Sequence, residues 1–92
     1  MGRASKRKPT RLAEKLLQIR LALGLSQNEL IRHLELTDEL LQASISGYEL
    51  GTRIPPLPVL LRYAEVAGVC TDMLINDKLD LPDKLPSKPK HR

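Results

Sequence analysis

The sequence contains no tryptophan and no phenylalanine, and two tyrosines make up its 2% of aromatic residues. Proteins that hold single-stranded nucleic acid stack its bases on aromatic side chains, so this class of binder is excluded. A single cysteine excludes an internal disulfide and a four-cysteine zinc site. The two histidines, His33 and His91, lie far apart in the chain, which gives little support for a metal site.

The chain also has no apolar run that approaches the roughly 18 residues of a membrane-spanning helix. Its 92 residues suit one small domain, and a content of 41% hydrophobic and 28% charged residues suits a soluble folded chain. Leucine occupies 19 positions and β-branched residues are few, a composition that favours helices. We therefore expect a soluble, cytoplasmic, all-α protein.

The net charge of +4 is unevenly distributed along the chain. Residues 1–25 carry seven Lys or Arg against one acid, residues 26–68 carry three against six, and residues 69–92 carry five against four. An excess of positive charge favours polyanionic partners. Residues 1–9 are predicted to form a basic flexible arm, which either contacts a polyanion such as DNA or serves solubility alone.

Apolar periodicity and helix-ending glycines predict five short helices within residues 10–76. The first helix begins at Thr10 and ends at Gly24. The residues expected on its buried face are Leu12, Leu16, Leu17, Ile19, Leu21 and Leu23. A capping box at residues 26–29 begins the second helix, which ends between His33 and Glu35.

The third helix is expected to begin between Thr37 and Gln42, with Thr37 or Asp38 as its cap, and to end at Leu50. Pro58 suits the first turn of a fourth helix, because proline is favoured at that position. A short fifth helix follows at 71–75. Residues 77–92 contain prolines and alternating charges, and they are predicted to form an extended tail outside the domain.

Three stretches of sequence carry a resemblance to a known family. They are GLSQNELI at 24–31, ISGYELG with RIP at 45–55, and LLRYA with AGVCTDML at 60–74. In this order they resemble the phage repressor and Cro-like (XRE-type) helix-turn-helix family over about 65 of the 92 residues. The resemblance implies a lambda-repressor-like fold of five helices and sequence-specific binding of double-stranded DNA. It further implies a transcriptional regulator, with repression the expected mode, that acts as a homodimer without a cofactor or metal.

By this resemblance the third helix lies in the major groove, with short polar side chains at its N-terminal end facing the bases. The residues assigned to DNA contact there are Gln42, Ala43, Ser44, Ser46 and Gly47. Gln42 is expected to bind adenine, because a carboxamide can bond N6 and N7 together. The alternative is an ordinary exposed helix residue. Ile45 and Tyr48 are expected to anchor the helix in the core.

Contacts with the phosphate backbone are assigned to three further residues. Gln27 and Asn28 open the second helix, where the helix dipole and free N–H groups favour a phosphate. Arg53 stands in the loop after the third helix. The alternative for all three is a solvated polar residue without a partner. By the same resemblance, Arg20 and Glu49 are assigned a structural ion pair that fixes the first helix against the third.

The sequence departs from the family pattern in the connection between the second and third helices. Four extra residues lie within residues 37–41, which is close to one helical turn. They either extend the third helix or loop out. An extension would place Asp38 and Glu39 nearest the DNA, where carboxylates repel phosphates.

Two other classes of function are considered. A helix-turn-helix used for protein interaction, as an antitoxin-like or adaptor module, is favoured by the negative middle segment and the acidic insertion. An enzyme is not expected, because the sequence has no paired catalytic carboxylates, no nucleophile near a base and no phosphate loop.

The last helix and the tail contain the apolar residues available for a dimer interface, namely Leu74, Ile75, Leu79, Leu81 and Leu85. These side chains could instead cover the core of the monomer. Cys70 is expected to be a small packed residue, because it follows Val69 in an apolar stretch.

Overall fold

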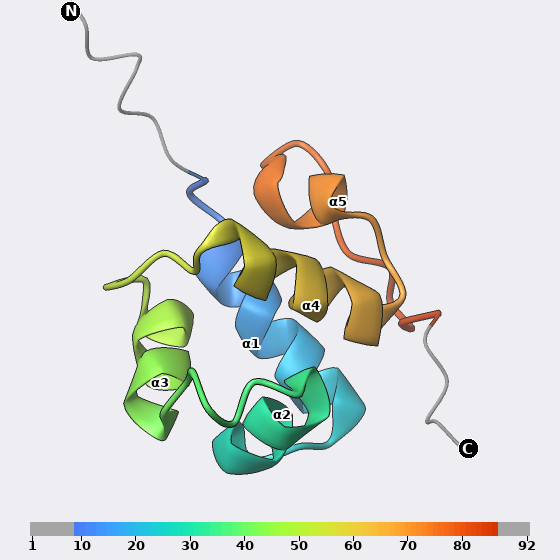
Figure 1. The fold of residues 1–92 in the computed structure, drawn as a ribbon. Coiled ribbons are helices and arrows are strands. Elements are labelled where there is room, and N and C mark those ends of the chain that lie inside the picture. Colours follow the sequence, from blue (N-terminus) through green and yellow to red (C-terminus); the bar gives the residue numbers. More distant parts are fainter. Residues whose placement is uncertain (1–8, 87–92) are drawn as a thin grey trace, which may run out of the picture.

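The computed structural model describes residues 9–86, which form five α-helices and no β-strand (Figure 1). The helices are α1 (Leu12–Leu23), α2 (Gln27–Leu34), α3 (Gln42–Leu50), α4 (Leu57–Ala67) and α5 (Thr71–Ile75). Over residues 9–86 the prediction of an all-α fold with five helices is therefore confirmed. Residues 1–8, which make up nearly all of the predicted basic arm, lie outside the described residues, as do residues 87–92.

Local sequence signals set the helix ends. α1 and α3 end at Gly24 and Gly51, which adopt left-handed φ values of 73° and 81° that glycine tolerates without strain. α2 begins at the predicted capping box, in which Ser26 Oγ accepts a hydrogen bond from the Glu29 N–H at 3.1 Å. The Ser26 N–H in turn donates to Glu29 Oε1 at 2.8 Å. Pro58 lies in the first turn of α4, as predicted.

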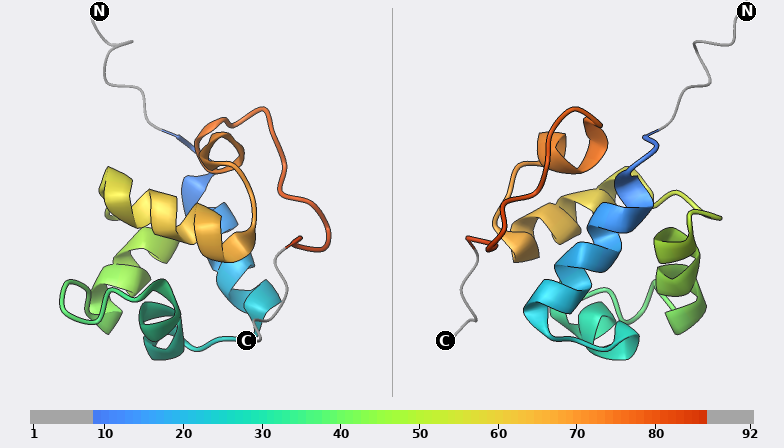
Figure 2. Two further views of the ribbon diagram at one scale, coloured as in Figure 1. Left: turned by 45° about the vertical axis from the view of Figure 1, so that its right-hand side comes forward. Right: turned by 180° about the vertical axis from the view of Figure 1, so that it is seen from behind.

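α1 lies at the centre of the arrangement and packs against α3, α4 and α5, whereas α2 packs against α3 and α4. All three views place α5 at the opposite end of the molecule from α2 (Figures 1 and 2). The N-terminal half of α1 therefore meets α5, and its C-terminal half leads directly into α2.

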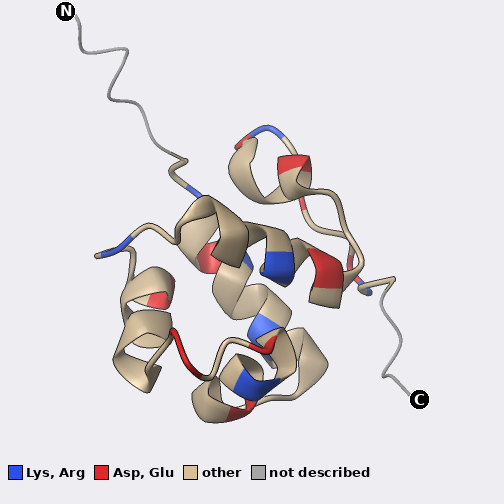
Figure 3. Ribbon diagram, viewed as in Figure 1, with Lys and Arg blue, Asp and Glu red and all other residues tan. Residues whose placement is uncertain are grey.

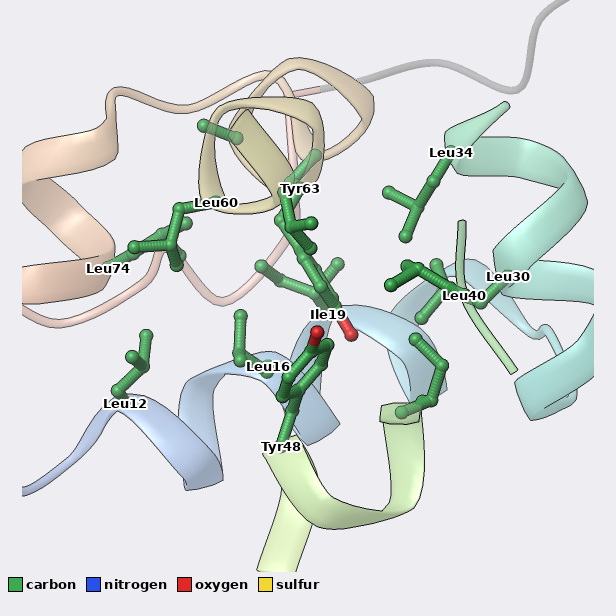
Figure 4. Packing of buried hydrophobic residues seen from close by; sticks show 14 of the residues in the cluster. Leu12, Leu16, Ile19, Leu30, Leu34, Leu40, Tyr48, Leu60, Tyr63 and Leu74 are labelled. Atoms are coloured by element: carbon green, nitrogen blue, oxygen red, sulfur yellow. The ribbon is translucent and has the colours of Figure 1, made fainter. Parts of the chain in front are cut away.

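All five helices contribute to a single core (Figure 4). Its buried apolar residues are Leu12, Leu16, Ile19, Leu30, Ile31, Leu34, Leu40, Ile45, Tyr48, Val59, Leu60, Tyr63, Ala64, Ala67, Leu74 and Leu81. The prediction was wrong for Leu21, which is exposed. At 100° of rotation per residue, Leu21 lies about 180° around the helix from Leu12 and so faces solvent.

Lys15 is fully buried, an unexpected position for a charged residue. Its ammonium group donates to the backbone oxygens of Met73 at 2.7 Å and Asn76 at 2.9 Å. These carbonyls belong to the last turn of α5 and the residue after it, where a cation is favourable. Burial lowers the pKa of Lys15 below its ordinary value.

Residues 77–86 fold back onto the helices and do not form the extended tail that was predicted. Leu81 is buried and Leu85 is partly buried against the core. The Asp77 carboxylate accepts hydrogen bonds from the N–H groups of Thr10 at 3.0 Å and Arg11 at 3.1 Å, so it caps the start of α1. The boundary predicted at residue 76 is wrong, because this segment completes the core and caps the first helix.

Two further expectations change with this packing. Leu74 and Leu81 belong to the core of the monomer and are not available for a dimer interface, whereas Ile75 and Leu79 are exposed. Cys70 is exposed and not packed. It is the N-cap residue of α5 and its backbone is extended.

Candidate nucleic-acid interface

The segment between α2 and α3 sets the position of the N-terminal end of α3. After α2, Glu35 adopts a left-handed φ of 62°. The backbone oxygen of Leu36 then accepts hydrogen bonds from the N–H groups of Glu39 at 3.0 Å and Leu40 at 2.9 Å. These bonds close a tight turn, and α3 begins only at Gln42. Residues 37–41 therefore loop out and do not extend α3.

The first turn of α3 is held by its own hydrogen bonds. The Leu41 N–H donates to Ser44 Oγ at 3.2 Å, and the Leu41 carbonyl accepts from the Ser44 N–H at 2.9 Å. Neither Thr37 nor Asp38 caps the helix, contrary to expectation. Ser44, which was assigned to DNA contact, is half-buried and its hydroxyl accepts this internal bond.

A continuous chain of side-chain hydrogen bonds connects α1 to the N-terminal ends of α2 and α3. The Arg20 guanidinium donates to Glu49 through Nε at 2.7 Å and Nη2 at 3.0 Å. Gln27 Nε2 donates to Glu49 Oε1 at 3.1 Å, and Gln42 Nε2 donates to Gln27 Oε1 at 3.1 Å. The structure thus brings together the two residues assigned to the ion pair and two residues assigned to DNA.

The ion pair in this chain is largely sealed from solvent. The side chains of Arg20 and Glu49 are 16% and 6% exposed, and the hydrogen bonds to Glu49 raise the pKa of Arg20. Arg20 also donates to the Leu25 carbonyl at 3.0 Å, so its donors are directed into the protein and not toward a phosphate. The role of Arg20 is therefore structural. Gln27 and Gln42 continue the hydrogen-bonded chain from Glu49 to the surface.

The carboxamide of Gln42 is exposed and is oriented by its hydrogen bond to Gln27. One of its two N–H groups is bonded to Gln27, which leaves the second N–H and the oxygen for an external partner. Gln27 is half-buried and retains one N–H. Asn28, the next residue of α2, is exposed. A side chain that is already oriented loses less conformational entropy when it binds, which favours specific contact.

The remaining residues of α3 divide between the core and the surface. Ile45 and Tyr48 are buried, as expected for the anchors of the helix. Ala43 is exposed and Ser46 is half-buried. The exposed surface at the start of α3 therefore consists of small or amide side chains, next to Leu41.

Gly47 is buried, so it does not present a surface to the bases as was expected. A Cβ atom at this position would lie 2.9 Å from Cδ and 3.0 Å from Cγ of Arg53. The Gly47 carbonyl also accepts hydrogen bonds from the N–H groups of Thr52 at 3.0 Å and Arg53 at 3.2 Å. Gly47 thus provides the close approach that places the stem of Arg53 along α3, while Arg53 as a whole is exposed.

The net charge of the described residues is opposite in sign to that of the whole chain. Residues 9–86 contain eight Lys or Arg against eleven Asp or Glu, a net charge of −3, whereas residues 1–8 and 87–92 contain seven Lys or Arg and no acid. The turn between α2 and α3 is acidic and the loop between α3 and α4 carries the basic residue Arg53 (Figure 3). Among the exposed residues of this face, negative charge therefore lies in the turn before α3, and positive charge lies at Arg53 in the loop after α3 and at Arg32 on α2.

Comparison with protein-family models, with curated proteins and with solved structures finds no match for this chain. Within residues 9–86, no helix has the length and apolar character needed to cross a membrane. No group of three His, Cys, Asp or Glu side chains in the same range is arranged to hold a metal ion. A function is therefore inferred from the geometry of α2, α3 and the loop after α3.

Proposed function

We propose that the protein binds double-stranded DNA sequence-specifically and acts as a transcriptional regulator, in the repressor mode. In this proposal α2 and α3 form a helix-turn-helix of the lambda-repressor-like kind, and the N-terminal end of α3 enters the major groove. The observation that carries the proposal is the hydrogen-bonded chain from the buried Arg20–Glu49 pair through Gln27 to the exposed amide of Gln42. It orients an exposed carboxamide, which favours bidentate recognition of adenine because less side-chain freedom is lost on binding.

The phosphate contacts follow from the same arrangement. Gln27 and Asn28 lie at the N-terminal end of α2, where the remaining Gln27 N–H, the backbone and the helix dipole favour an anion. Arg53 lies in the loop after the C-terminal end of α3, and its stem packs against Gly47. Contacts on both sides of the recognition helix would fix its register on the duplex.

Because residues 9–86 carry a negative net charge, most of the non-specific DNA affinity is expected to come from the terminal segments. Those segments carry seven positive charges, four of them in residues 1–8. Each phosphate neutralised by such a charge makes binding more sensitive to salt. The folded part would then supply specificity, and the terminal segments would supply affinity.

A second copy of the chain is the proposed partner, because dimers of this motif place two recognition helices about 34 Å apart. Leu74 and Leu81 are buried in the core, so other residues must form the dimer interface. An open groove of about 370 Å³ is lined by Leu57, Pro58, Leu60, Leu61, Thr71 and Ile75. Leu61→Lys in this groove is expected to convert a dimer to a monomer in sedimentation velocity, with an unchanged circular dichroism spectrum.

The DNA proposal is tested with a duplex that the wild-type protein selects from a random-sequence pool. Gln42→Ala should weaken binding of this duplex about tenfold or more, since a bidentate contact accounts for about 1–3 kcal/mol of discrimination. Gln18→Ala, an exposed glutamine on α1, is the matched control and should change nothing. Equal affinity of all three proteins for the selected duplex would contradict the proposal.

A protein-binding module is the second candidate, and the acidic turn favours it. Asp38 and Glu39 are exposed beside the start of α3, where they would repel phosphates. The double variant Asp38→Asn with Glu39→Gln separates the two functions. If α3 meets DNA, the variant binds duplex more tightly at low salt. An unchanged duplex affinity would favour a protein partner.

A further inference from the structure

We propose that Leu41 contacts the 5-methyl group of a thymine in the base pair next to the adenine that Gln42 binds. The inference rests on the proposed function and deepens it by naming the chemistry of two successive base pairs. Leu41 is a specificity-determining residue in this account, although it precedes α3 and is apolar.

Leu40 and Leu41 are consecutive leucines in opposite environments. Leu40 is 7% exposed and belongs to the core, whereas Leu41 is 72% exposed. The backbone at Leu41 is extended, with φ −115° and ψ 165°, and consecutive side chains of an extended segment point to opposite sides. Burial of Leu40 therefore directs Leu41 outward.

Leu41 is held in place and does not belong to a loose loop. Its N–H donates to Ser44 Oγ, and its carbonyl accepts from the N–H groups of Ser44 at 2.9 Å and Ile45 at 3.3 Å. A single exposed leucine is ordinary on a protein surface. The distinguishing feature of Leu41 is its fixed place directly beside Gln42, whose amide is itself oriented by Gln27.

The two side chains match the major-groove edges of neighbouring A·T pairs. Adenine offers N6 and N7 to a carboxamide, and thymine offers a methyl group that takes apolar contacts. Consecutive Cα atoms are about 3.8 Å apart and consecutive base pairs about 3.4 Å apart. Adjacent side chains can therefore reach adjacent base pairs, Gln42 by its amide and Leu41 by its branched carbons.

The chain offers a matched control at the other end of the same helix. Leu50 is 73% exposed, so it equals Leu41 in residue type and exposure. It is the last residue of α3 and lies away from Gln42 along the helix axis. Comparison of Leu50→Ala with Leu41→Ala thus separates the effect of removing any exposed leucine from the effect of removing the leucine beside Gln42.

The test uses the selected duplex with each thymine replaced in turn by deoxyuridine, which removes only the 5-methyl group. At one position, wild type and Leu50→Ala should bind the deoxyuridine duplex about threefold to fivefold more weakly, as expected for one buried methyl group. Leu41→Ala should bind the thymine and deoxyuridine duplexes equally at that position. Fluorescence anisotropy gives the affinities, and circular dichroism checks that the variants are folded.

Two results would overturn the proposal in distinguishable ways. If Leu41→Ala keeps the wild-type ratio of affinities at every thymine while the duplex is still bound specifically, Leu41 has another partner, such as an apolar pocket on a protein. If the wild-type protein selects no duplex at all, the proposed function itself fails, and this inference fails with it.

Discussion

The side-chain stem of Arg53 lies directly against Gly47, where a Cβ atom would stand 2.9 Å from Cδ. Because Arg53 is exposed, its side chain can move away from an added methyl group. We expect Gly47→Ala to keep or raise stability, by up to about 1 kcal/mol from helix propensity. The same variant should weaken duplex binding as much as Arg53→Ala does. Urea unfolding and anisotropy measure the two effects, and unchanged DNA affinity would contradict this role of Gly47.

The Arg20–Glu49 pair should be worth more than a surface ion pair, because both side chains are largely buried. Glu49→Gln is expected to lower the free energy of unfolding by about 2–3 kcal/mol, below the roughly 3–5 kcal/mol of a fully buried pair. Glu65→Gln is the control, since Glu65 pairs with Arg62 at the surface and should cost about 0.5 kcal/mol or less. Equal losses in urea unfolding would show that burial of the pair adds nothing.

The hydroxyl group of Tyr63 is buried and has no hydrogen-bond partner within residues 9–86. Desolvation also raises the pKa of this phenol. An unpaired buried hydroxyl costs about 1–3 kcal/mol, so Tyr63→Phe should stabilise the fold by about 1 kcal/mol. Tyr48→Phe is the comparison, because Tyr48 borders an open pocket and should respond less. A loss of stability in Tyr63→Phe would reveal a partner for the hydroxyl.

Asp77 should make stability depend on pH in the acidic range. Hydrogen bonds from Thr10 and Arg11 lower the pKa of Asp77 below its ordinary value. A carboxylate with a lowered pKa in the folded state contributes stability above its unfolded pKa of about 3.9. This contribution is lost as the pH falls through the folded-state pKa.

The measurement for Asp77 is thermal unfolding of wild type and Asp77→Asn at neutral pH and at about pH 2.5, which lies below the ordinary Asp pKa. The difference in Tm should be largest at neutral pH and should shrink in acid. Asp83→Asn is the control, because Asp83 is exposed and accepts no hydrogen bond from the described residues. A difference in Tm that is the same at both pH values would contradict the linkage.

The features that the sequence predicted well are local ones. The capping box at Ser26 and Glu29 and the helix ends at Gly24 and Gly51 depend on residues within one turn of each other. The buried anchors Ile45 and Tyr48 followed from the resemblance and from the apolar back that a recognition helix needs. Such signals need no knowledge of which helices meet.

The features that the sequence could not predict depend on contacts between distant segments. Asp77 caps α1 across 66 residues, and Lys15 binds the end of α5 across 58. No periodicity marks either contact. The choice between a longer α3 and a looped-out insertion was also open, because four residues are close to one helical turn and could extend the helix without changing its faces. Burial of Leu40 accompanies the looped-out arrangement.

The role of Gly47 was missed for a related reason. As a residue of the proposed recognition helix it was assigned to the DNA surface, yet it contacts a loop residue six positions later. Glycine inside a helix costs about 1 kcal/mol relative to alanine and therefore indicates a close approach, but the sequence does not identify the group that approaches.

Binding to duplex DNA at two salt concentrations tests the central claim most directly. The duplex is the one selected from the random pool, labelled for fluorescence anisotropy and challenged with a scrambled duplex of the same composition. We predict binding roughly 10³-fold or more tighter for the selected duplex, with this ratio retained at the higher salt. Binding that ignores sequence and disappears at the higher salt would contradict the account. In that case only the positive charge of the terminal segments, and not α3, would be in contact with DNA.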